Sequence, residues 1–512
     1  MSQFKVIKGG KEPERPSGSG SAGGKKSTQK SASRTSTRSA TSGTTRGATS
    51  GTTRGATRST QWGVPQESDL DSRQGTQLNA PFFDDPFEEL DALGAAVDAG
   101  ADAAEANAVA KARGSKSDSH SSDLDFEGIN APGLRWAWAD VDLDAISFNT
   151  KSIRKHIGSD VHIMAVVKAQ GYGHGAVATA RAALSSGASY LGVATVQEGV
   201  ELREAGIDAP TLVLVEPPHE SIPLILDYDL ITTVQTTEFA LALGEAADAQ
   251  DTAALYHLKI DTGMNRHGVH YSDAGDFLRT VDFHRGLELH GVFTHFATSD
   301  AHDTLDVRRQ LEYFNQALEN IRYMGISPGI VHAANSAALI RFKETHFDMV
   351  RPGIALYGLH TSEITNDLIA LKPAMSVRAR ITQLKQVPVG EGVSYGFTYR
   401  SPGNVLVGTI PLGYADGLSR VLSNRMDVLV DGRAYPQVGT ICMDACMFEI
   451  DLRSTPLKPR QDIIIGDEVV IIGRSGALEI TLDDMARALG TINYDLACRF
   501  GMRLGRRYLG GD

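Results

Sequence analysis

The sequence predicts an α/β protein: a (β/α)8 TIM-like barrel, followed by a mostly-β C-terminal domain and preceded by a long disordered N-terminal extension. In the middle of the chain, short apolar runs of strand length alternate with stretches of helical spacing. Strand-like runs continue after residue 371 with few helices between them, and low-complexity sequence dominates the first 60 residues. We therefore divide the chain into an extension (1–130), a barrel domain (131–371) and a β domain (372–512).

The extension begins with a basic segment at residues 1–60, which carries 12 Lys and Arg against 2 Asp and Glu. The octamer Thr-Ser-Gly-Thr-Thr-Arg-Gly-Ala occurs twice in tandem, at 41–48 and 49–56. Such a segment cannot bury enough apolar area to offset its chain entropy, so we expect it to be disordered. No aromatic residue interleaves the charges between Phe4 and Trp62, so no specific nucleic-acid binding is expected.

An acidic segment follows at residues 61–130, with 15 Asp and Glu against 4 Lys and Arg. It contains an aromatic and acidic cluster, Pro81–Phe87, and an Ala-rich stretch at 87–113 with helical spacing of its apolar residues. Two interpretations stay open. The stretch is either a partly helical linker, or residues 61–113 bind an unknown partner.

Composition is typical of a soluble cytoplasmic protein. The hydrophobic content of 41% is ordinary, and no apolar run approaches the ~18 residues of a membrane helix, so no membrane association is expected. The first residues lack the apolar core of a signal peptide. Three cysteines, Cys442, Cys446 and Cys498, suit a reducing compartment rather than a disulfide framework. No second Cys/His pair lies near the first two, so no metal site is expected.

Ordered structure is predicted to begin near Leu134. The alternation in Trp136–Val141 indicates a strand, and Asp142 or Asp144 can cap the helix that follows. Eight runs of strand length come next: 161–167, 190–194, 211–215, 230–234, 255–260, 288–293, 329–333 and 353–358. Helical stretches such as 197–205 and 310–319 separate them. Eight β-then-α units favour a closed barrel over a doubly wound sheet.

The first barrel run ends on Lys168, and a glycine-rich loop with Tyr172 follows at once. Barrel enzymes place reactive groups at the carboxyl ends of their strands, where this lysine would lie. A lysine there is more often a solvated charge. However, pyridoxal phosphate (PLP) needs such an amine for its Schiff base, and a tyrosine four residues on could reach the phosphate.

Polar motifs at later strand ends favour the PLP interpretation. They are Lys259–Gly268 after the fifth run, Thr294–Ala297 after the sixth, His332–Ala337 after the seventh, and Arg351–Ile354 leading into the eighth. Each motif alone has a structural explanation, such as a salt-bridged arginine or a packed histidine. Together, around one predicted barrel, they predict an active site.

Beyond residue 371 the pattern is that of a mostly-β domain. Strand-like runs lie at 375–386, 404–410, 426–430 and 462–472. Val430-Asp-Gly-Arg433 is a hairpin-turn signal. Gly466–Gly473 has a glycine at each end but lacks the following Gly-rich turn and helix, which excludes a dinucleotide-binding motif.

Eight motifs within residues 134–510 resemble those of the alanine racemase family, PLP enzymes of fold-type III. They are Val166–Gly175, Lys259–Arg266, Ala334–Ala338, Arg351–Ile354, Ser394–Gly396, Gly413–Gly417, Cys442–Asp444 and Gly490–Tyr494. The resemblance implies an isomerase that interconverts L-alanine and D-alanine and provides D-alanine for peptidoglycan. The first 130 residues lie outside it.

The resemblance also implies roles for single residues. Lys168 would hold PLP and be the base on one face, and Tyr395 of a second subunit would be the base on the other. The enzyme would therefore be a homodimer with shared active sites. The cofactor would be bound by Tyr172, Ser336, Tyr494 and the backbone N–H groups of Gly353 and Ile354 at its phosphate, by Arg351 at its pyridine nitrogen, and also by Asn335 and His295. His295 would in addition support the tyrosine base through the Arg351 network.

Substrate contacts follow from the same resemblance. Arg266 and the partner's Met443 backbone would bind the alanine carboxylate. Lys259 matches a lysine that is often carbamylated in the family, which would make it an anion that orients Arg266. Tyr414 and Tyr494 would narrow the entrance.

General chemistry agrees with these roles. Racemisation removes an α-proton from one face and returns it to the other, so two bases must flank the substrate. A guanidinium such as Arg351 keeps its proton, which leaves the pyridine nitrogen unprotonated and a weaker electron sink. Side reactions such as transamination should then be suppressed.

Competing interpretations differ in what they require. A non-catalytic PLP-binding barrel lacks the second domain, whereas this chain has one with Tyr395. A fold-type III decarboxylase has a cysteine at that position. A broader small amino-acid racemase stays open, because apolar pockets reject close analogues weakly. A scaffold whose function lies in the extension would be distinguished by truncation to residue 131.

Overall fold

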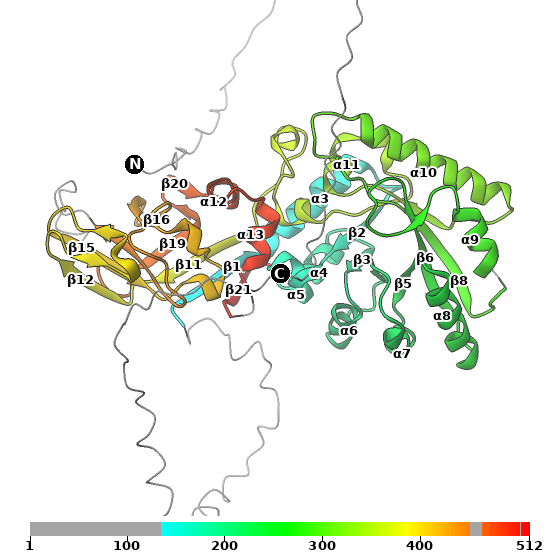
Figure 1. Ribbon diagram of the computed structural model, residues 1–512, viewed down its shortest axis with the longest axis horizontal. Helices are drawn as coiled ribbons and strands as arrows, with labels where there is room; N and C mark the ends of the chain where they lie inside the picture. The colour runs from blue at the N-terminus through cyan, green and yellow to red at the C-terminus, as the bar shows by residue number, and fades with distance from the viewer. Residues whose placement is uncertain (1–134, 282, 451–462, 502, 512) are drawn as a thin grey trace, which may run out of the picture. The chain divides into compact units, whose positions relative to one another are not determined.

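The computed structural model describes residues 135–512, apart from residues 282, 451–462, 502 and 512 (Figure 1). It consists of a barrel of parallel strands and a set of mainly antiparallel sheets. The extension predicted at residues 1–130, with its basic and acidic segments, lies outside the described residues.

Eight parallel strands form the barrel, and the ring closes because β5 pairs with β6 and β10 pairs with β2. The strands are β2 (His162–Val166), β3 (Tyr190–Val193), β4 (Thr211–Val213), β5 (Ile231–Val234), β6 (Ala254–Asp261), β8 (Leu287–Phe293), β9 (Ile330–His332) and β10 (Met349–Val350). A short strand, β7 (Val269–His270), pairs with the end of β6. The closed barrel is confirmed, and the first seven predicted runs coincide with its strands.

The prediction for the eighth strand is wrong. Strand β10 lies at Met349–Val350, and the run 353–358 instead contains the 3-10 turn η3 (Ile354–Tyr357). This run is apolar because its side chains are fully buried, and a buried apolar run does not by itself distinguish a strand from a helical turn. Arg351 therefore follows the eighth strand and does not lead into it, which still places it at a carboxyl end.

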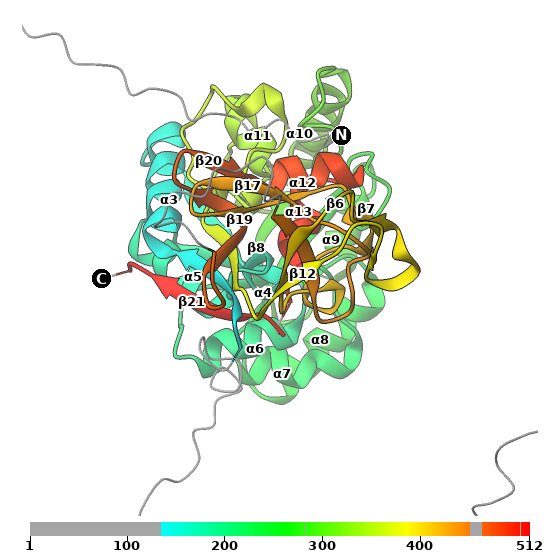
Figure 2. The same ribbon diagram turned by 90° about the vertical axis from the view of Figure 1, so that its left-hand side faces the viewer.

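Helices cover the outside of the barrel (Figures 1 and 2). They are α3 (Leu143–Ile157), α5 (Ala176–Ser185), α6 (Val196–Glu204), α7 (Ile222–Asp227), α8 (Thr237–Ala249), α9 (Ala274–Val281), α10 (Leu305–Tyr323) and α11 (Ser336–Arg341). Of the two candidate caps for α3, Asp142 is the one used, since its carboxylate accepts from the Ala145 N–H at 2.9 Å. The apolar faces of the helices and the outward faces of the strands form one continuous core.

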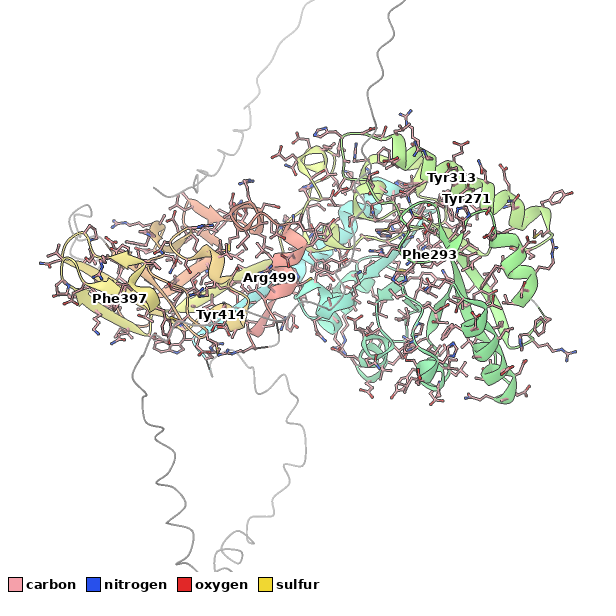
Figure 3. The ribbon with its side chains drawn as sticks, viewed as in Figure 1. Tyr271, Phe293, Tyr313, Phe397, Tyr414 and Arg499 are labelled. Carbon is pink, nitrogen blue, oxygen red and sulfur yellow. The ribbon has the colours of Figure 1, made fainter. Side chains whose placement is uncertain are left out.

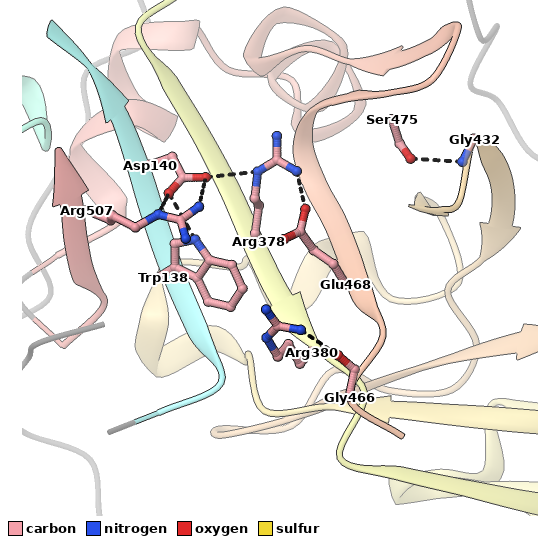
Figure 4. Close-up of polar contacts among 9 residues, drawn as sticks. All are labelled: Trp138, Asp140, Arg378, Arg380, Gly432, Gly466, Glu468, Ser475 and Arg507. Atoms are coloured by element: carbon pink, nitrogen blue, oxygen red, sulfur yellow. Dashed lines mark hydrogen bonds and ion pairs between the residues drawn. The ribbon is translucent and has the colours of Figure 1, made fainter. Parts of the chain in front are cut away.

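Strand β1 (Ala137–Asp142) precedes the barrel in sequence but pairs outside it. It runs antiparallel to β11 (Met375–Arg380) and parallel to β21 (Gly505–Leu509). The buried carboxylate of Asp140 joins the three strands, because it accepts from Arg507 Nε at 2.6 Å and pairs with Arg378 Nε at 3.0 Å (Figure 4). The second domain is thus built from both ends of the described chain.

The second domain is mostly β, as predicted. Its large sheet has the order β17-β16-β19-β11-β1-β21, and a three-stranded sheet has the order β12-β15-β18. Their strands, with the pair β13–β14 and the strand β20, are β12 (Gln383–Val387), β13 (Gly392–Val393), β14 (Tyr399–Arg400), β15 (Val405–Ile410), β16 (Asp427–Val430), β17 (Arg433–Pro436), β18 (Cys446–Ile450), β19 (Glu468–Ser475) and β20 (Leu478–Ile480). Two helices follow, α12 (Leu482–Leu489) and α13 (Asn493–Arg499).

The predicted hairpin turn joins β16 to β17. Asp431 and Gly432 have φ values of 46° and 73°, the pair of positive angles that a two-residue hairpin turn requires. The Gly432 N–H donates to Oγ of Ser475 at 2.9 Å, which ties the turn to β19 (Figure 4). The Asp-Gly dipeptide was therefore a reliable local signal.

Candidate active site

A cavity of about 270 Å³ lies at the carboxyl ends of the barrel strands. It gathers most of the residues that the sequence motifs singled out: Lys168, Tyr172, Lys259, Arg266, His295, Asn335, Ser336, Arg351, Gly353, Ile354 and Tyr494. These residues are separated by up to 326 positions in the chain. Barrel closure brings all of them except Tyr494 to one place, and Tyr494 comes from α13 of the second domain.

Lys168 begins the turn α4 (Lys168–Tyr172), whose backbone is left-handed. Ala169, Gln170 and Tyr172, none of them glycine, have φ values of 52°, 54° and 51°. A left-handed conformation costs such residues about 1–2 kcal/mol each, so other contacts must hold the turn. One of them is the Ala169 N–H, which donates to Oε1 of Glu198 at 2.6 Å. The sequence predicted a glycine-rich loop here, and the structure shows a left-handed turn.

The Lys168 amine is strongly influenced by its surroundings. Burial lowers its pKa from the usual value, and the nearby Arg266 guanidinium lowers it further. A larger fraction of this amine is therefore neutral than for an exposed lysine. A neutral amine is the form that acts as a nucleophile or a base.

Ser336 and Gly353 build a polar cradle on one side of the cavity. Oγ of Ser336, the first residue of α11, accepts from the Gly353 N–H at 2.9 Å. A Cβ atom at residue 353 would lie 2.5 Å from the Tyr172 hydroxyl, so a larger residue there would displace the Tyr172 ring. Asn335 caps α11 by accepting from the Ala338 N–H at 3.0 Å. A helix N-terminus with a hydroxyl and free space suits an anion such as a phosphate.

Arg351 is buried and contacts four acceptors. Nη1 donates to Nδ1 of His332 at 2.9 Å, and Nη2 contacts Nδ1 of His295 at 3.1 Å. Nη2 also donates to the backbone oxygens of Thr294 and Ala333 at 2.7 and 2.9 Å. Burial lowers the pKa of the guanidinium to about 9, so it remains protonated at neutral pH. The guanidinium is thus a fixed cation whose orientation is set by four partners.

Positive charge dominates the cavity. The amine of Lys259 and the guanidinium of Arg351 each lie 5.4 Å from the ring centre of Phe293, which lies inside the barrel (Figure 3). Burial, followed by Arg266, Arg351 and Lys168, lowers the pKa of Lys259 to about 8. No Asp or Glu is among the residues that line this cavity. Such a cavity attracts small anionic molecules.

Three predicted site residues do not line this cavity. Tyr395, Tyr414 and Met443 belong to the second domain, where their side chains are 72%, 42% and 51% exposed. Tyr414 is marked in Figure 3. Tyr395 lies on the 3-10 turn η5 (Tyr395–Phe397), and its backbone oxygen accepts from Oγ1 of Thr440 at 2.8 Å.

Four cavity residues do not belong to the predicted site. They are Val166, Leu214, Val215 and Phe293. Phe293 directly precedes a predicted motif, so its position at the last residue of β8 was a usable signal. Leu214 and Val215 end the predicted run 211–215, but they carry no polar group that would have singled them out.

The fold and the cavity are those of a (β/α)8-barrel enzyme with a second, mostly-β domain and a cationic cavity around a half-buried lysine. The family model "Alanine racemase, N-terminal domain" matches residues 141–361, and "Alanine racemase, C-terminal domain" matches residues 374–508. The chain belongs to the alanine racemase family.

Individual relatives agree with the family models. An alanine racemase of Halothermothrix orenii is 42% identical over 380 residues, which cover 74% of this chain and 98% of the relative. An alanine racemase of Halalkalibacterium halodurans is 44% identical over 381 residues, covering 73% and 95%.

Solved structures show the same fold. The alanine racemase of Bacillus anthracis with bound L-Ala-P has 37% identity and a TM-score of 0.70, covering 74% of this chain and 96% of the other. The structure from E. faecalis has 34% identity and a TM-score of 0.68, covering 74% and 100%.

Membrane-crossing helices and metal-binding clusters are both absent from the described residues. No helix there is long and apolar enough to cross a membrane. Among the same residues, no group of three or more His, Cys, Asp or Glu is arranged to hold a metal ion.

Proposed function

We propose that this protein interconverts L-alanine and D-alanine with PLP held on Lys168, in a homodimer that shares its active sites. The observation that supports this best is the half-buried Lys168 in a cationic cavity that Ser336 and Gly353, the polar cradle, also line. A broader preference for small amino acids is the alternative.

The cavity residues fit PLP. The cradle of Ser336, Gly353 and Tyr172 would bind the phosphate, together with the Ile354 N–H and the Tyr494 hydroxyl. Tyr172 and Tyr494 lie with ring centres 6.4 Å apart, and burial raises the pKa of both phenols, so both stay neutral donors. When bound, PLP supplies the electron sink that makes the α-proton of an amino acid acidic.

Arg351 would face the pyridine nitrogen. Its guanidinium is protonated and held by four acceptors, so it donates a hydrogen bond without transferring a proton. An electron sink that gains no proton is weaker, which favours simple return of the α-proton over transamination. His295 and Asn335 would complete this wall of the site.

Two bases would act on opposite faces of the substrate. The Lys168 amine is one, because its lowered pKa makes the neutral form accessible. Tyr395 is the other, and it would come from a second copy of the chain, since in its own chain it is exposed and does not line the cavity. The partner's Met443 backbone and Tyr414 would approach the same cavity, and Tyr414 and Tyr494 would narrow its entrance.

Arg266 would bind the substrate carboxylate, and Lys259 would be carbamylated. A neutral amine is the form that adds carbon dioxide, and a pKa of about 8 makes that form abundant near neutral pH. The resulting anion would lie among Arg266, Arg351 and Lys168, the cations that now lower the Lys259 pKa. It would orient Arg266 toward the substrate.

In the cell, we propose that the enzyme works in the cytoplasm and supplies D-alanine for peptidoglycan. The deciding experiment incubates the full chain and PLP with L-alanine in D2O. D-alanine that carries an α-deuterium supports the proposal. Exchange of the α-proton without inversion would contradict the role of Tyr395. The absence of both exchange and inversion would contradict alanine as the substrate. A chain shortened to residue 131 measures whether the extension contributes to activity.

A further inference from the structure

Three histidines extend the Arg351 contacts through the inside of the barrel. His332 lies at the end of β9, His257 within β6 and His290 within β8. Nε2 of His332 is 2.7 Å from Nδ1 of His257, and Nε2 of His257 is 2.9 Å from Nδ1 of His290. The first two imidazoles are completely buried and the third is half-buried. One continuous hydrogen-bonded chain therefore runs from Arg351 to His290.

The direction of donation along this chain follows from its first member. A guanidinium only donates, so Nδ1 of His332 must accept and its Nε2 carries the proton. That Nε2 then donates to His257, which in turn donates from its own Nε2 to His290. Each imidazole must be neutral, because a second proton on any of them would set two donors against each other.

The strand pairing of the barrel is irregular at His290, where the hydrogen-bonded chain of histidines ends. In the β6–β8 register, Tyr256 is opposite Leu289, but the next residue, His257, is opposite Gly291. His290 is thus the extra residue of a bulge, and bulges commonly re-aim a side chain. A Cβ atom at Gly291 would lie 2.6 Å from Cε1 of His257, so the ring of His257 occupies the space that glycine leaves.

The bulge changes which side chains of β8 face inward. Leu289 and Val292 pack into the core between strands and helices, whereas Phe293 lines the cavity. In a regular strand, successive side chains alternate between the two faces, so at most one of the two residues between Leu289 and Val292 would face inward. The bulge lets both of them, His290 and Gly291, face inward. One supplies the acceptor for His257 and the other makes room for its ring.

We propose that His290 is a positioning residue that acts on Arg351 through His257 and His332. As the final acceptor, it binds the Nε2 proton that Arg351 imposes on His257, and so stabilises the tautomers that keep Nδ1 of His332 available to the guanidinium. This inference rests on the proposed function, in which Arg351 faces the pyridine nitrogen of PLP.

The surroundings of His290 contain few charges. Glu288 lies two residues away on β8, and its charge raises the pKa of His290, whereas burial has the larger effect and lowers it. Tyr190 of β3 lies 6.2 Å away between ring centres, and it in turn contacts His162 of β2. Among the described residues, His257 bonds to His290 directly, and His332 interacts with it from one imidazole further away. Burial therefore favours the neutral imidazole that the chain requires.

The test uses the full-length enzyme with bound PLP and two substitutions. His290→Gln keeps an acceptor that cannot ionise, and His290→Leu removes the acceptor. His302→Gln changes an exposed histidine that is not part of the hydrogen-bonded chain, and it is the matched control. Nitrogen-15 NMR of labelled imidazoles, without substrate, identifies which ring nitrogen carries the proton. The visible absorbance of PLP, kcat and KM are measured from pH 5 to 9.

We expect His257 and His332 to carry their protons on Nε2 in the wild type, in His290→Gln and in the control. In His290→Leu we expect loss of that tautomer at His257, a shifted PLP absorbance and a fall in kcat of about tenfold with KM nearly unchanged. His290→Gln should restore kcat and the absorbance to within about threefold of wild type, with a weaker dependence on acid pH.

The opposite tautomer at His257 or His332 in the wild type would overturn the inference, even if no variant folds. So would a His290→Leu enzyme with unchanged tautomers, absorbance and kcat. The proposed function fails in a different way: the wild type would then form no D-alanine, whereas the NMR result would still decide the role of His290.

Discussion

Glu198 holds the backbone of Ala169 from a different helix: its Oε1 accepts from the Ala169 N–H at 2.6 Å, while its Oε2 accepts from the Ala194 N–H at 2.7 Å. The first bond supports the left-handed turn that presents Lys168, and the second supports the start of α6. One carboxylate thus stabilises both the reactive lysine and the helix beside it.

Glu198→Ala should therefore lower the free energy of unfolding by about 2 kcal/mol, since hydrogen bonds to a charged acceptor contribute about 1.5–3 kcal/mol. Urea titration of the folded chain measures this loss. Glu220→Ala, at an exposed carboxylate, is the control and should change stability by less than about 0.5 kcal/mol. Equal effects of the two substitutions would contradict the role of Glu198.

Lys168→Ala should abolish the visible absorbance of lysine-bound PLP, because no other residue is proposed to form that bond. The spectrum of the purified variant with added PLP gives the answer directly. Lys151→Ala removes an exposed lysine on α3 and should leave the absorbance unchanged. An unchanged spectrum in Lys168→Ala would mean that another amine, such as Lys259, binds the cofactor.

Tyr395→Phe should slow α-proton removal from L-alanine far more than from D-alanine. A positioned base contributes about 10²–10⁴-fold, and only one of the two faces loses its base. Solvent deuterium incorporation, followed separately from each enantiomer, measures the two rates. Tyr323→Phe, at a side chain that is 93% exposed, should leave both rates unchanged. Equal slowing of both directions in Tyr395→Phe would contradict the two-base assignment.

Lys259 should react with carbon dioxide at neutral pH. Its pKa of about 8 lies well below the 10.5 of an ordinary lysine, so its neutral fraction near pH 7 is on the order of 100-fold larger. Mass spectrometry of the intact enzyme in bicarbonate should show the mass of one added carboxylate, which Lys259→Met abolishes. The same addition in the Lys259→Met enzyme would assign the modification elsewhere.

His174 should make the fold sensitive to acid. Burial lowers its pKa from 6.5 to about 4, so below pH 6.5 the unfolded chain binds a proton that the folded chain does not. The contribution of neutral His174 to the free energy of unfolding is about 3 kcal/mol. It is fully present above pH 6.5 and is lost as the pH falls toward about 4.

Urea titrations between pH 7 and 4 would measure that loss. His174→Phe should weaken the pH dependence by up to this amount, whatever its effect on stability at pH 7. The exposed His302→Gln should keep the wild-type dependence. A pH dependence that is the same in His174→Phe and wild type would show that other groups are responsible.

Local chemistry explains why much of the fold was predictable. Seven apolar runs became barrel strands because parallel strands buried on both faces are continuous in apolar residues. The Asp142 cap and the Asp431–Gly432 turn depend only on neighbours in sequence. The prediction of a strand at 353–358 is wrong because a buried strand and a buried helical turn have the same apolar sequence. Only the packing of η3 in the folded protein distinguishes the two.

The sequence by itself indicated most of the polar groups that line the cavity, since motifs at strand ends must meet once a barrel closes. Tertiary structure alone decided three things. It paired β1 with the second domain, gave Lys168 a left-handed turn held by Glu198, and used a bulge at His290 to extend the Arg351 contacts. These outcomes depend on contacts between residues far apart in the chain, whose energies no local pattern records.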